Sequence, residues 1–245
     1  MLNGLLAGIA AYGEALRLIN RLRLWGYILA PGLISLLLGF GIFGSAWGIS
    51  DDIGRRLIAL YPFEWGRDFL EGLANIIGGL FVVALGLVLF KHLVLALASP
   101  FMSFFSEKIE REITGRAEEV SFSLSRLVGD LLRGIRIALR NIIRELLFTL
   151  ILLFLGLIPV LSPFTTLGIF ILQSYYAGFG NLDYLMERHF TVRQSVRFVR
   201  RNAGLAIGNG AVFLLLLFSI VGFLFALPLA TAAATVEGSR RLEKS

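Results

Sequence analysis

The sequence contains no cysteine, so a disulfide framework, a thiolate zinc site and a cysteine nucleophile are all excluded. It has only two histidines, His92 and His189, so a histidine-built metal site would also need carboxylate ligands. Charged residues make up 16% of the 245 residues, whereas a soluble domain carries roughly a quarter. By contrast, 57% of the residues are hydrophobic and Phe occurs 21 times, which argues against disorder. This composition predicts an integral membrane protein.

Two charge-free stretches in the first half of the chain have the length of membrane-spanning helices. A helix needs roughly 20 apolar residues to cross a hydrocarbon layer about 30 Å thick. The stretches are Leu24–Ser50 and Gly72–Phe90. They predict two long transmembrane helices, over residues 26–48 and 73–98. Pro100 should break the second helix, because a proline inside a helix removes a backbone hydrogen bond and clashes with the preceding turn.

Two later charge-free stretches, residues 146–182 and 202–236, are too long for one span and too short for two comfortable ones. Pro159 and Pro163 interrupt the first of them, and Gly222 lies near the middle of the second. We therefore expect two re-entrant helical hairpins with their tips at these residues. Two ordinary, slightly short spans in each stretch remain the alternative. The fold class predicted overall is an all-α membrane protein in one domain, residues 1–245.

Amphipathic segments separate the apolar stretches. Residues 1–22 predict an interfacial helix, residues 101–145 cytoplasmic amphipathic helices, and residues 183–201 a basic cytoplasmic segment. Two sets of arginines each share a helical face: Arg126, Arg133, Arg136, Arg140 and Arg144, then Arg193, Arg197, Arg200 and Arg201. The plainer interpretation is a face that binds solvent or lipid headgroups. The sharper one is an electropositive funnel for anions.

Charge also predicts the orientation in the membrane. The predicted external loop, residues 51–71, has three arginines against five carboxylates, while the flanking segments are basic. Because basic residues stay on the cytoplasmic side, both termini should be cytoplasmic. The net charge of +6 lies beside apolar runs, which favours anionic lipid headgroups as partners over nucleic acid.

Nothing in the sequence predicts an enzyme or a cofactor site. Glycine occurs 27 times, but no Gly-x-Gly-x-x-Gly or Walker-type run follows a strand. Gly4 with Gly8, and Gly204 with Gly208, have the spacing that favours close helix packing. Paired carboxylates lie in loop contexts, where acid–base chemistry lacks the desolvated cleft it needs. No catalytic residue, metal or cofactor is expected.

Lys91 and His92 form the most notable ionisable pair, because they follow nineteen uncharged residues. Intramembrane charges are often functional. Snorkelling of both side chains to the cytoplasmic interface is the simpler interpretation.

A succession of short motifs carries a family resemblance over nearly the whole chain. The motifs are Leu29-Ala-Pro31, Ala98-Ser-Pro-Phe101, Glu107-Lys-Ile-Glu110, Ile158-Pro159 with Pro163, Asp183-Tyr184 and Leu227-Pro-Leu-Ala-Thr-Ala-Ala-Ala-Thr235. In this order they resemble the CysZ-type sulfate permeases, which share a domain with the etoposide-induced 2.4 proteins. The resemblance implies an oligomeric permease of the bacterial inner membrane, for sulfate or a related inorganic anion. The alternative is a non-transport membrane protein that organises lipids or scaffolds other proteins.

The resemblance also implies where an anion binds. CysZ-type proteins have a Gly-Leu/Ile-Arg-Arg segment just before the first span, and two guanidinium groups there suit a tetrahedral dianion. This chain has Arg23-Leu24-Trp25-Gly26 instead, so the arginine pair is not matched, as in a distant member. The candidate anion-binding residues are Arg21, Arg23, Trp25 and Gly26. Possible secondary contacts with an anion or lipid are Lys91, His92, Arg133, Arg140 and Arg197.

Overall fold

The computed structural model describes residues 1–29, 31–42, 85–115, 124–219 and 222–243, and the regular structure in these ranges is helical. In chain order the helices are α1 (Leu2–Arg21), the short 3₁₀ helix η1 (Leu24–Ile28), a helix over residues 31–42, the Leu85–Leu97 helix, α4 (Ser99–Thr114), α5 (Leu124–Gly156), α6 (Ser162–His189), α7 (Val192–Arg201), α8 (Ala203–Leu217) and α9 (Gly222–Leu242). The all-helical prediction is confirmed for these residues. The predicted external loop, the end of the first predicted span and the start of the second lie outside them.

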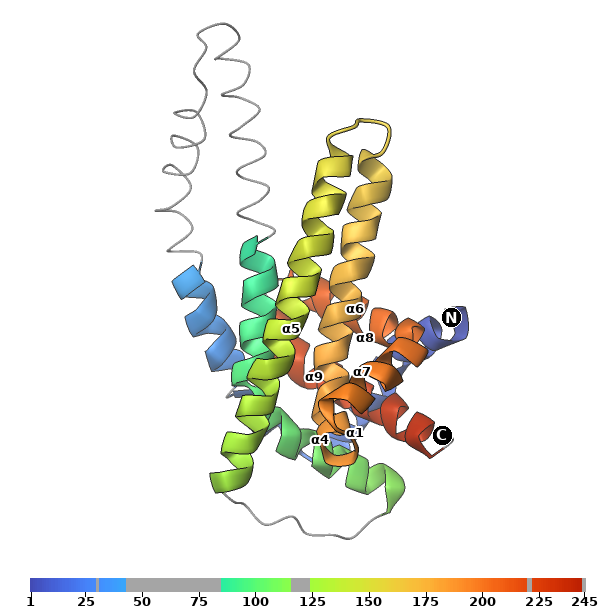
Figure 1. Cartoon of the computed structure of the whole chain (residues 1–245). Helices are drawn as coiled ribbons and strands as arrows, with labels where there is room; N and C mark the ends of the chain where they lie inside the picture. Colours follow the sequence, from blue (N-terminus) through green and yellow to red (C-terminus); the bar gives the residue numbers. More distant parts are fainter. Residues whose placement is uncertain (30, 43–84, 116–123, 220–221, 244–245) are drawn as a thin grey trace, which may run out of the picture.

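The α5 and α6 helices form a long hairpin that projects from the rest of the molecule (Figure 1). Pro159 lies in the turn, and Pro163 occupies the first turn of α6, where its missing N–H leaves no hydrogen bond unmade. The turn therefore lies where the prolines predicted it. The two helices of the hairpin extend beyond the predicted residues 146–182, because α5 begins at Leu124 and α6 continues to His189. The predicted boundary between residues 145 and 146 thus falls inside one continuous helix.

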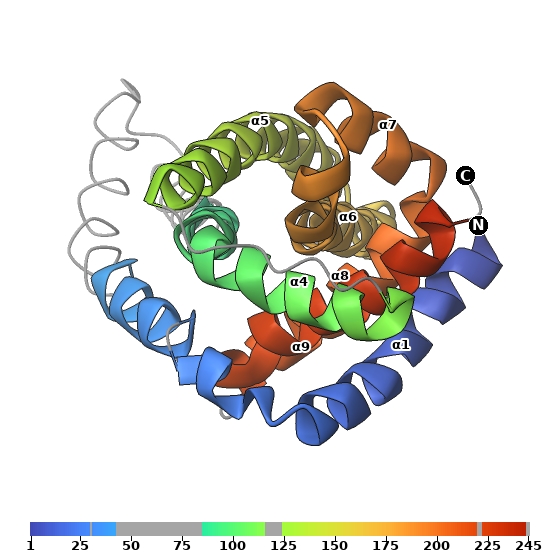
Figure 2. The ribbon, with the colours of Figure 1, turned by 90° about the horizontal axis from the view of Figure 1, so that it is seen from below.

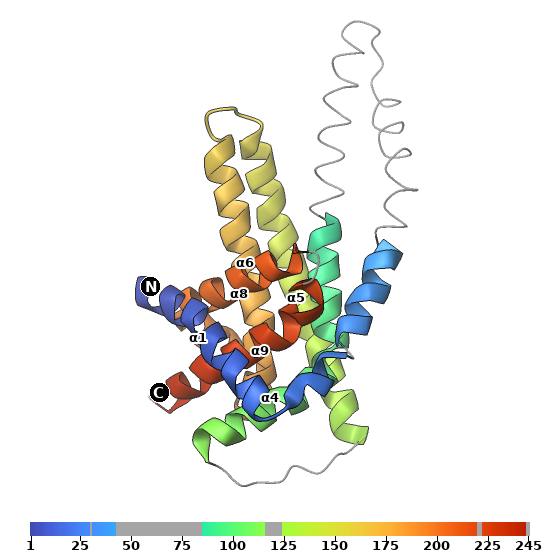
Figure 3. The same ribbon diagram turned by 180° about the vertical axis from the view of Figure 1, so that it is seen from behind.

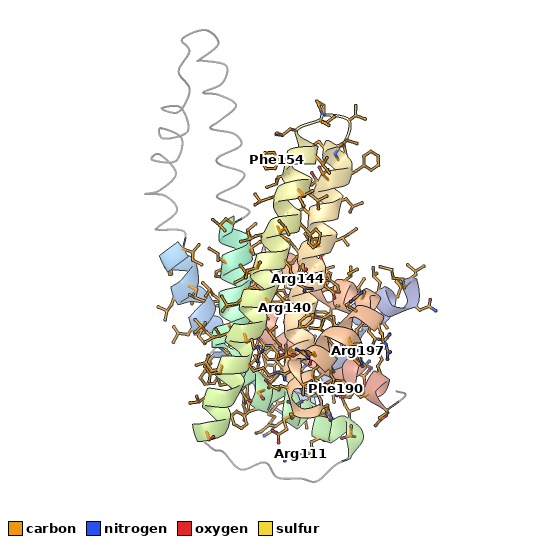
Figure 4. The ribbon with its side chains drawn as sticks, viewed as in Figure 1. Arg111, Arg140, Arg144, Phe154, Phe190 and Arg197 are labelled. Carbon is orange, nitrogen blue, oxygen red and sulfur yellow. The ribbon has the colours of Figure 1, made fainter. Side chains whose placement is uncertain are left out.

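Large apolar side chains cover the outside of this hairpin. Figure 4 shows Phe154 pointing away from it near the tip, and this side chain is 69% exposed. Between residues 147 and 171 of the hairpin, the exposed large apolar residues are Leu147, Phe148, Ile151, Phe154, Leu155, Leu157, Ile158, Val160, Leu161, Phe164, Leu167, Phe170 and Ile171. Apolar surface this continuous is typical of a region that contacts lipid or another protein.

The α8 helix packs closely between α1 and α6, and glycines make this possible. A Cβ atom on Gly8 would lie 2.7 Å from the Leu205 carbonyl oxygen, and one on Gly208 would lie 2.2 Å from that of Leu5. This confirms the close packing that the glycine spacing predicted. On the other side of α8, a Cβ on Gly178 of α6 would lie 1.9 Å from the Ala206 oxygen. The three helices can approach this closely only without side chains at these positions.

The α4 helix lies across the foot of the bundle, in front of α8 and α9 when seen from below (Figure 2). It bends by 64° from the Leu85–Leu97 helix, and the bend lies at the predicted Ser99-Pro100 break. Both ends of the described chain lie on one side of the molecule (Figure 3), where Arg240 of α9 donates to Glu14 of α1 at 2.7 Å.

Among the described residues, one helical stretch, Leu24–Ile42, is long and apolar enough to cross a membrane. The Leu85–Leu97 helix and α4 pass the same test only when they are taken together as a bent pair.

Candidate functional site

A buried triad of ionisable side chains, Lys91, His92 and Glu145, connects three helices of the bundle. Lys91 Nζ donates to Glu145 Oε1 on α5, and also to the Gln173 carbonyl oxygen on α6 at 3.2 Å. His92 Nε2 lies 2.8 Å from the other oxygen of Glu145. The side chains of Lys91 and His92 are each 1% exposed. The snorkelling interpretation is therefore wrong, because both side chains turn inward to a carboxylate instead of outward to an interface.

A second buried pair forms where α5, α6 and α7 meet. Arg133 binds Asp183 through two parallel hydrogen bonds, Nη2 to Oδ1 at 2.9 Å and Nε to Oδ2 at 3.1 Å. The same guanidinium donates to the Phe190 carbonyl oxygen and to the Ser195 hydroxyl, both at 2.8 Å. Arg133 was predicted as an anion or lipid contact, but its donors are engaged inside the protein.

A third ionic cluster joins α4 to the end of α6. Arg188 Nε donates to Glu110 Oε2 at 2.9 Å, and His189 Nε2 lies 2.5 Å from Glu110 Oε1. Burial favours a raised pKa for the Glu110 carboxyl, but the hydrogen bond from His189 and the charge of Arg188 outweigh it, so the pKa is lowered. Arg188 also donates to the Ser106 hydroxyl at 2.9 Å. The cluster fixes the end of α6 against the foot of the bundle.

A small cavity lies between the triad and the Arg133–Asp183 pair, with His92 and Asp183 both in its lining. His92, Asn141, Asp183 and Glu187 contribute to its lining, and its volume is about 20 Å³. Such a space accepts one water molecule and not a tetrahedral oxyanion. Burial, reinforced by the charge of Asp130, raises the pKa of the Glu187 carboxyl to about 8. Glu187 Oε1 is buried, and no described residue forms a hydrogen bond with it.

The predicted anion-binding residues lie elsewhere, at the junction of α1 and η1. Arg21 pairs with Glu112 of α4 at 2.5 Å, so its charge is already balanced. Arg23 has a left-handed backbone conformation, with φ of 54°, and an exposed side chain. Trp25 donates its indole N–H to Asn20 and packs edge-on against Phe225 in α9, and 42% of it remains exposed. A Cβ on Gly26 would meet nothing within 4 Å, so the backbone there is open to an approaching group.

The two arginine faces differ in how their charges are used. Arg140 donates to Asn141 at 2.7 Å and lies 5.4 Å from the centre of the Phe179 ring. Arg140, Arg144 and Arg200 all lie near Tyr175 of α6. Figure 4 shows Arg140 and Arg144 on α5, below the apolar upper part of the hairpin. On these two faces, six exposed arginines make no hydrogen bond or ion pair with a described residue: Arg136, Arg144, Arg193, Arg197, Arg200 and Arg201.

Sequence reasoning missed the acidic members of these clusters, although a signal was present. Glu145 and Asp183 are the charged residues that flank the charge-free stretch 146–182. Each turns inward and neutralises a cation at the base of the hairpin.

Within the described ranges, His, Asp and Glu side chains do not form a group of three or more that could hold a metal ion.

Comparison with known proteins shows which family the sequence is similar to. The family described as sulfate transporter CysZ/etoposide-induced protein 2.4 matches residues 11–228. The sulfate transporter CysZ of Pseudomonas aeruginosa is 29% identical over 98% of this chain and 99% of its own length. The protein of the same name from Pseudomonas paraeruginosa is 30% identical over 94% of both chains.

Proposed function

This chain belongs to the sulfate transporter CysZ/etoposide-induced protein 2.4 family, and we propose that it is a permease for sulfate or a related inorganic anion. Its location would be the bacterial inner membrane. The names of the relatives support transport as the activity, and transporters of this family are not enzymes. An inorganic anion as substrate agrees with the excess of exposed arginines over exposed carboxylates on α5 and α7.

The depth of the hairpin supports a re-entrant position in the membrane. From Arg144 to Gly156, α5 rises about 18 Å at 1.5 Å per residue. This is more than half of a hydrocarbon core about 30 Å thick, and less than all of it. With Arg144 at the level of the headgroups, the tip of the hairpin would lie beyond the midplane of the bilayer. The chain would then return through α6 to the side from which α5 entered. The basic faces and both termini would then be cytoplasmic, as the charge distribution predicts.

The observation that carries the proposed anion site is the free charge of Arg23. Its guanidinium is exposed, and it makes no hydrogen bond or ion pair with any described residue. It lies directly before the Leu24–Ile42 stretch, beside the open backbone at Gly26. An oxyanion arriving from water could exchange its hydration for the guanidinium donors. Arg21 would contribute only after the anion displaced Glu112 from it.

An oligomer fits the small number of candidate spans. One described stretch could cross the membrane, with one more if the bent pair counts, and two helices cannot enclose a polar route. The cavity beside the buried triad holds about 20 Å³, which is too little for sulfate. We propose that the route forms between copies of the chain.

The non-transport alternative is favoured by one feature, the exposed arginines around the base of an apolar hairpin. That arrangement also suits a protein that gathers anionic lipids or other membrane proteins. Flux of radiolabelled sulfate into proteoliposomes separates the two hypotheses. Uptake above empty vesicles supports the permease, and no uptake of sulfate, sulfite or thiosulfate supports the scaffold.

The same assay tests the site, with a matched control. Arg23→Gln should weaken the apparent sulfate affinity roughly tenfold or more, because a charge-assisted contact contributes about 1.5–3 kcal/mol. Arg17→Gln removes the same charge from an exposed α1 position, where the side chain bonds to the Gly13 carbonyl and to no other described residue, and it should retain transport. Equal effects of the two variants would discard Arg23 as a specific contact but keep the permease.

A further inference from the structure

A pocket of about 420 Å³ is lined by residues of α7, by Phe190 and Asn202 at either end of that helix, and by Arg241 in the last turn of α9. Three arginines line it, Arg197 and Arg201 from α7 and Arg241 from α9. Arg197 and Arg201 are one helical turn apart, an arrangement that is unfavourable for like charges unless something compensates them. Neither makes an ion pair or hydrogen bond with a described residue. The pocket therefore has an uncompensated positive charge.

The third arginine is held in position by the fold. Arg241 donates from Nε to Glu237 and from Nη1 to the side-chain oxygen of Asn202, both at 2.9 Å. Asn202 also lines the pocket. Glu237 pairs with Arg241 and is not among the lining residues, so the pocket itself presents three guanidinium groups. The planar donor fork of arginine matches the oxygens of a phosphate group.

Two phenylalanines, Phe190 and Phe198, also line the pocket. The rings of Phe190 and Phe198 pack against each other with centroids 5.8 Å apart, and Phe198 is buried. An inorganic anion would use only the arginines. The volume is within the roughly 300–1,000 Å³ of pockets that hold organic ligands. The combination suits a ligand that has both an anionic oxygen group and a hydrocarbon part.

The geometry points to this pocket as a binding site for a phosphate ester, with the phosphate on Arg197 and Arg201 and the carbon portion on the phenylalanines. Two sources offer this chemistry, the headgroup of an anionic phospholipid and a soluble phosphate ester. The inference goes beyond the proposed transport function, since it concerns a different ligand and a different part of the molecule from Arg23. Binding measured without transport keeps the two hypotheses separate.

Calorimetric titration of the purified full chain in neutral detergent tests the site. The probes are dioctanoyl phosphatidylglycerol, glycerol 3-phosphate and inorganic sulfate. The test variant is Arg197→Gln/Arg201→Gln. The control, Arg193→Gln/Arg200→Gln, removes the same charge from exposed positions of the same helix that do not line the pocket.

We expect the test variant to bind phosphatidylglycerol at least tenfold more weakly, and the control to remain within about twofold of the unmodified chain. Binding of the lipid alone identifies a headgroup as the source. Binding of glycerol 3-phosphate with the same loss in the test variant identifies a soluble ester. Equal losses in both variants, a loss of sulfate binding in the test variant as large as that of the esters, or no binding of either ester would overturn the inference.

Discussion

Lys91 and Glu145 form an ion pair in the interior of the protein, although 54 residues separate them in the sequence. Their side chains are 1% and 0% exposed. Taking two charges out of water is costly, so such a pair is maintained only where each partner compensates the other. His92 shares the same carboxylate, which makes Glu145 the centre of the arrangement.

Removing one member of this pair should strongly destabilise the fold. We expect Glu145→Gln to lower the free energy of unfolding by about 3–5 kcal/mol, because Lys91 would stay buried without its counter-ion. Lys91→Met/Glu145→Met removes both charges and should recover most of that loss. Denaturant unfolding of the purified protein in detergent, followed by tryptophan fluorescence, measures both. Equal destabilisation by the single and double variants would contradict this account.

Glu187 should make stability depend on pH. Its pKa of about 8 in the folded protein is above the usual value of 4.5, so between these values the folded state holds a proton that the unfolded state has released. Stability should therefore fall as pH rises through this window and level off above pH 8. Each kcal/mol lost lowers the melting temperature of a chain of this size by about 2–4 °C.

Glu187→Gln should remove this part of the pH dependence, because the amide does not titrate. Glu243→Gln changes an exposed carboxylate and should keep the slope of the unmodified protein. Melting temperatures between pH 6 and 8.5 provide the comparison. The same slope in all three proteins would show that Glu187 is not the group responsible.

Glycine substitutions should separate close packing from helix propensity. Gly178→Ala places a Cβ atom 1.9 Å from the Ala206 carbonyl oxygen, so α6 and α8 must move apart. We expect a loss of about 1–3 kcal/mol or more. Gly13→Ala meets nothing within 4 Å in α1 and should gain up to about 1 kcal/mol, since alanine favours helix. Thermal unfolding of the two variants shows whether each substitution raises or lowers the stability of the protein. Two losses of similar size would contradict the packing argument.

The orientation in the membrane can be tested by labelling, because the chain has no cysteine of its own. An impermeant maleimide added outside intact cells should react with a cysteine at Asp52. It should reach one at Ser245 only after the membrane is permeabilised. The opposite pattern would reverse the proposed orientation.

The hairpin should be inaccessible at its tip. A cysteine at Ser162, the first residue of α6, should resist impermeant maleimide from either side, because the tip would lie within the hydrocarbon. A cysteine at Arg136, exposed on the basic face of α5, should react from the cytoplasmic side. Free reaction of the Ser162 cysteine from outside would mean that α5 and α6 cross the membrane completely.

The sequence by itself determined the features that depend on neighbouring residues. Run length and composition predicted helices and apolar segments, Pro159 and Pro163 located the turn between α5 and α6, and Ser99-Pro100 located the bend before α4. These are local effects, since a missing N–H or a charge-free run acts within a few turns of its own position.

Only the tertiary structure decided how the charges are used. Helical periodicity placed Arg133 and Arg144 on one face, yet Arg133 bonds to Asp183 inside the protein and Arg144 remains exposed. Lys91 could have reached an interface, but the Leu85–Leu97 helix packs where Glu145 faces it. Ion pairing depends on which helices contact each other and on where along each helix the contact lies. Residues far apart in the sequence settle both through packing, so no local pattern contains the answer.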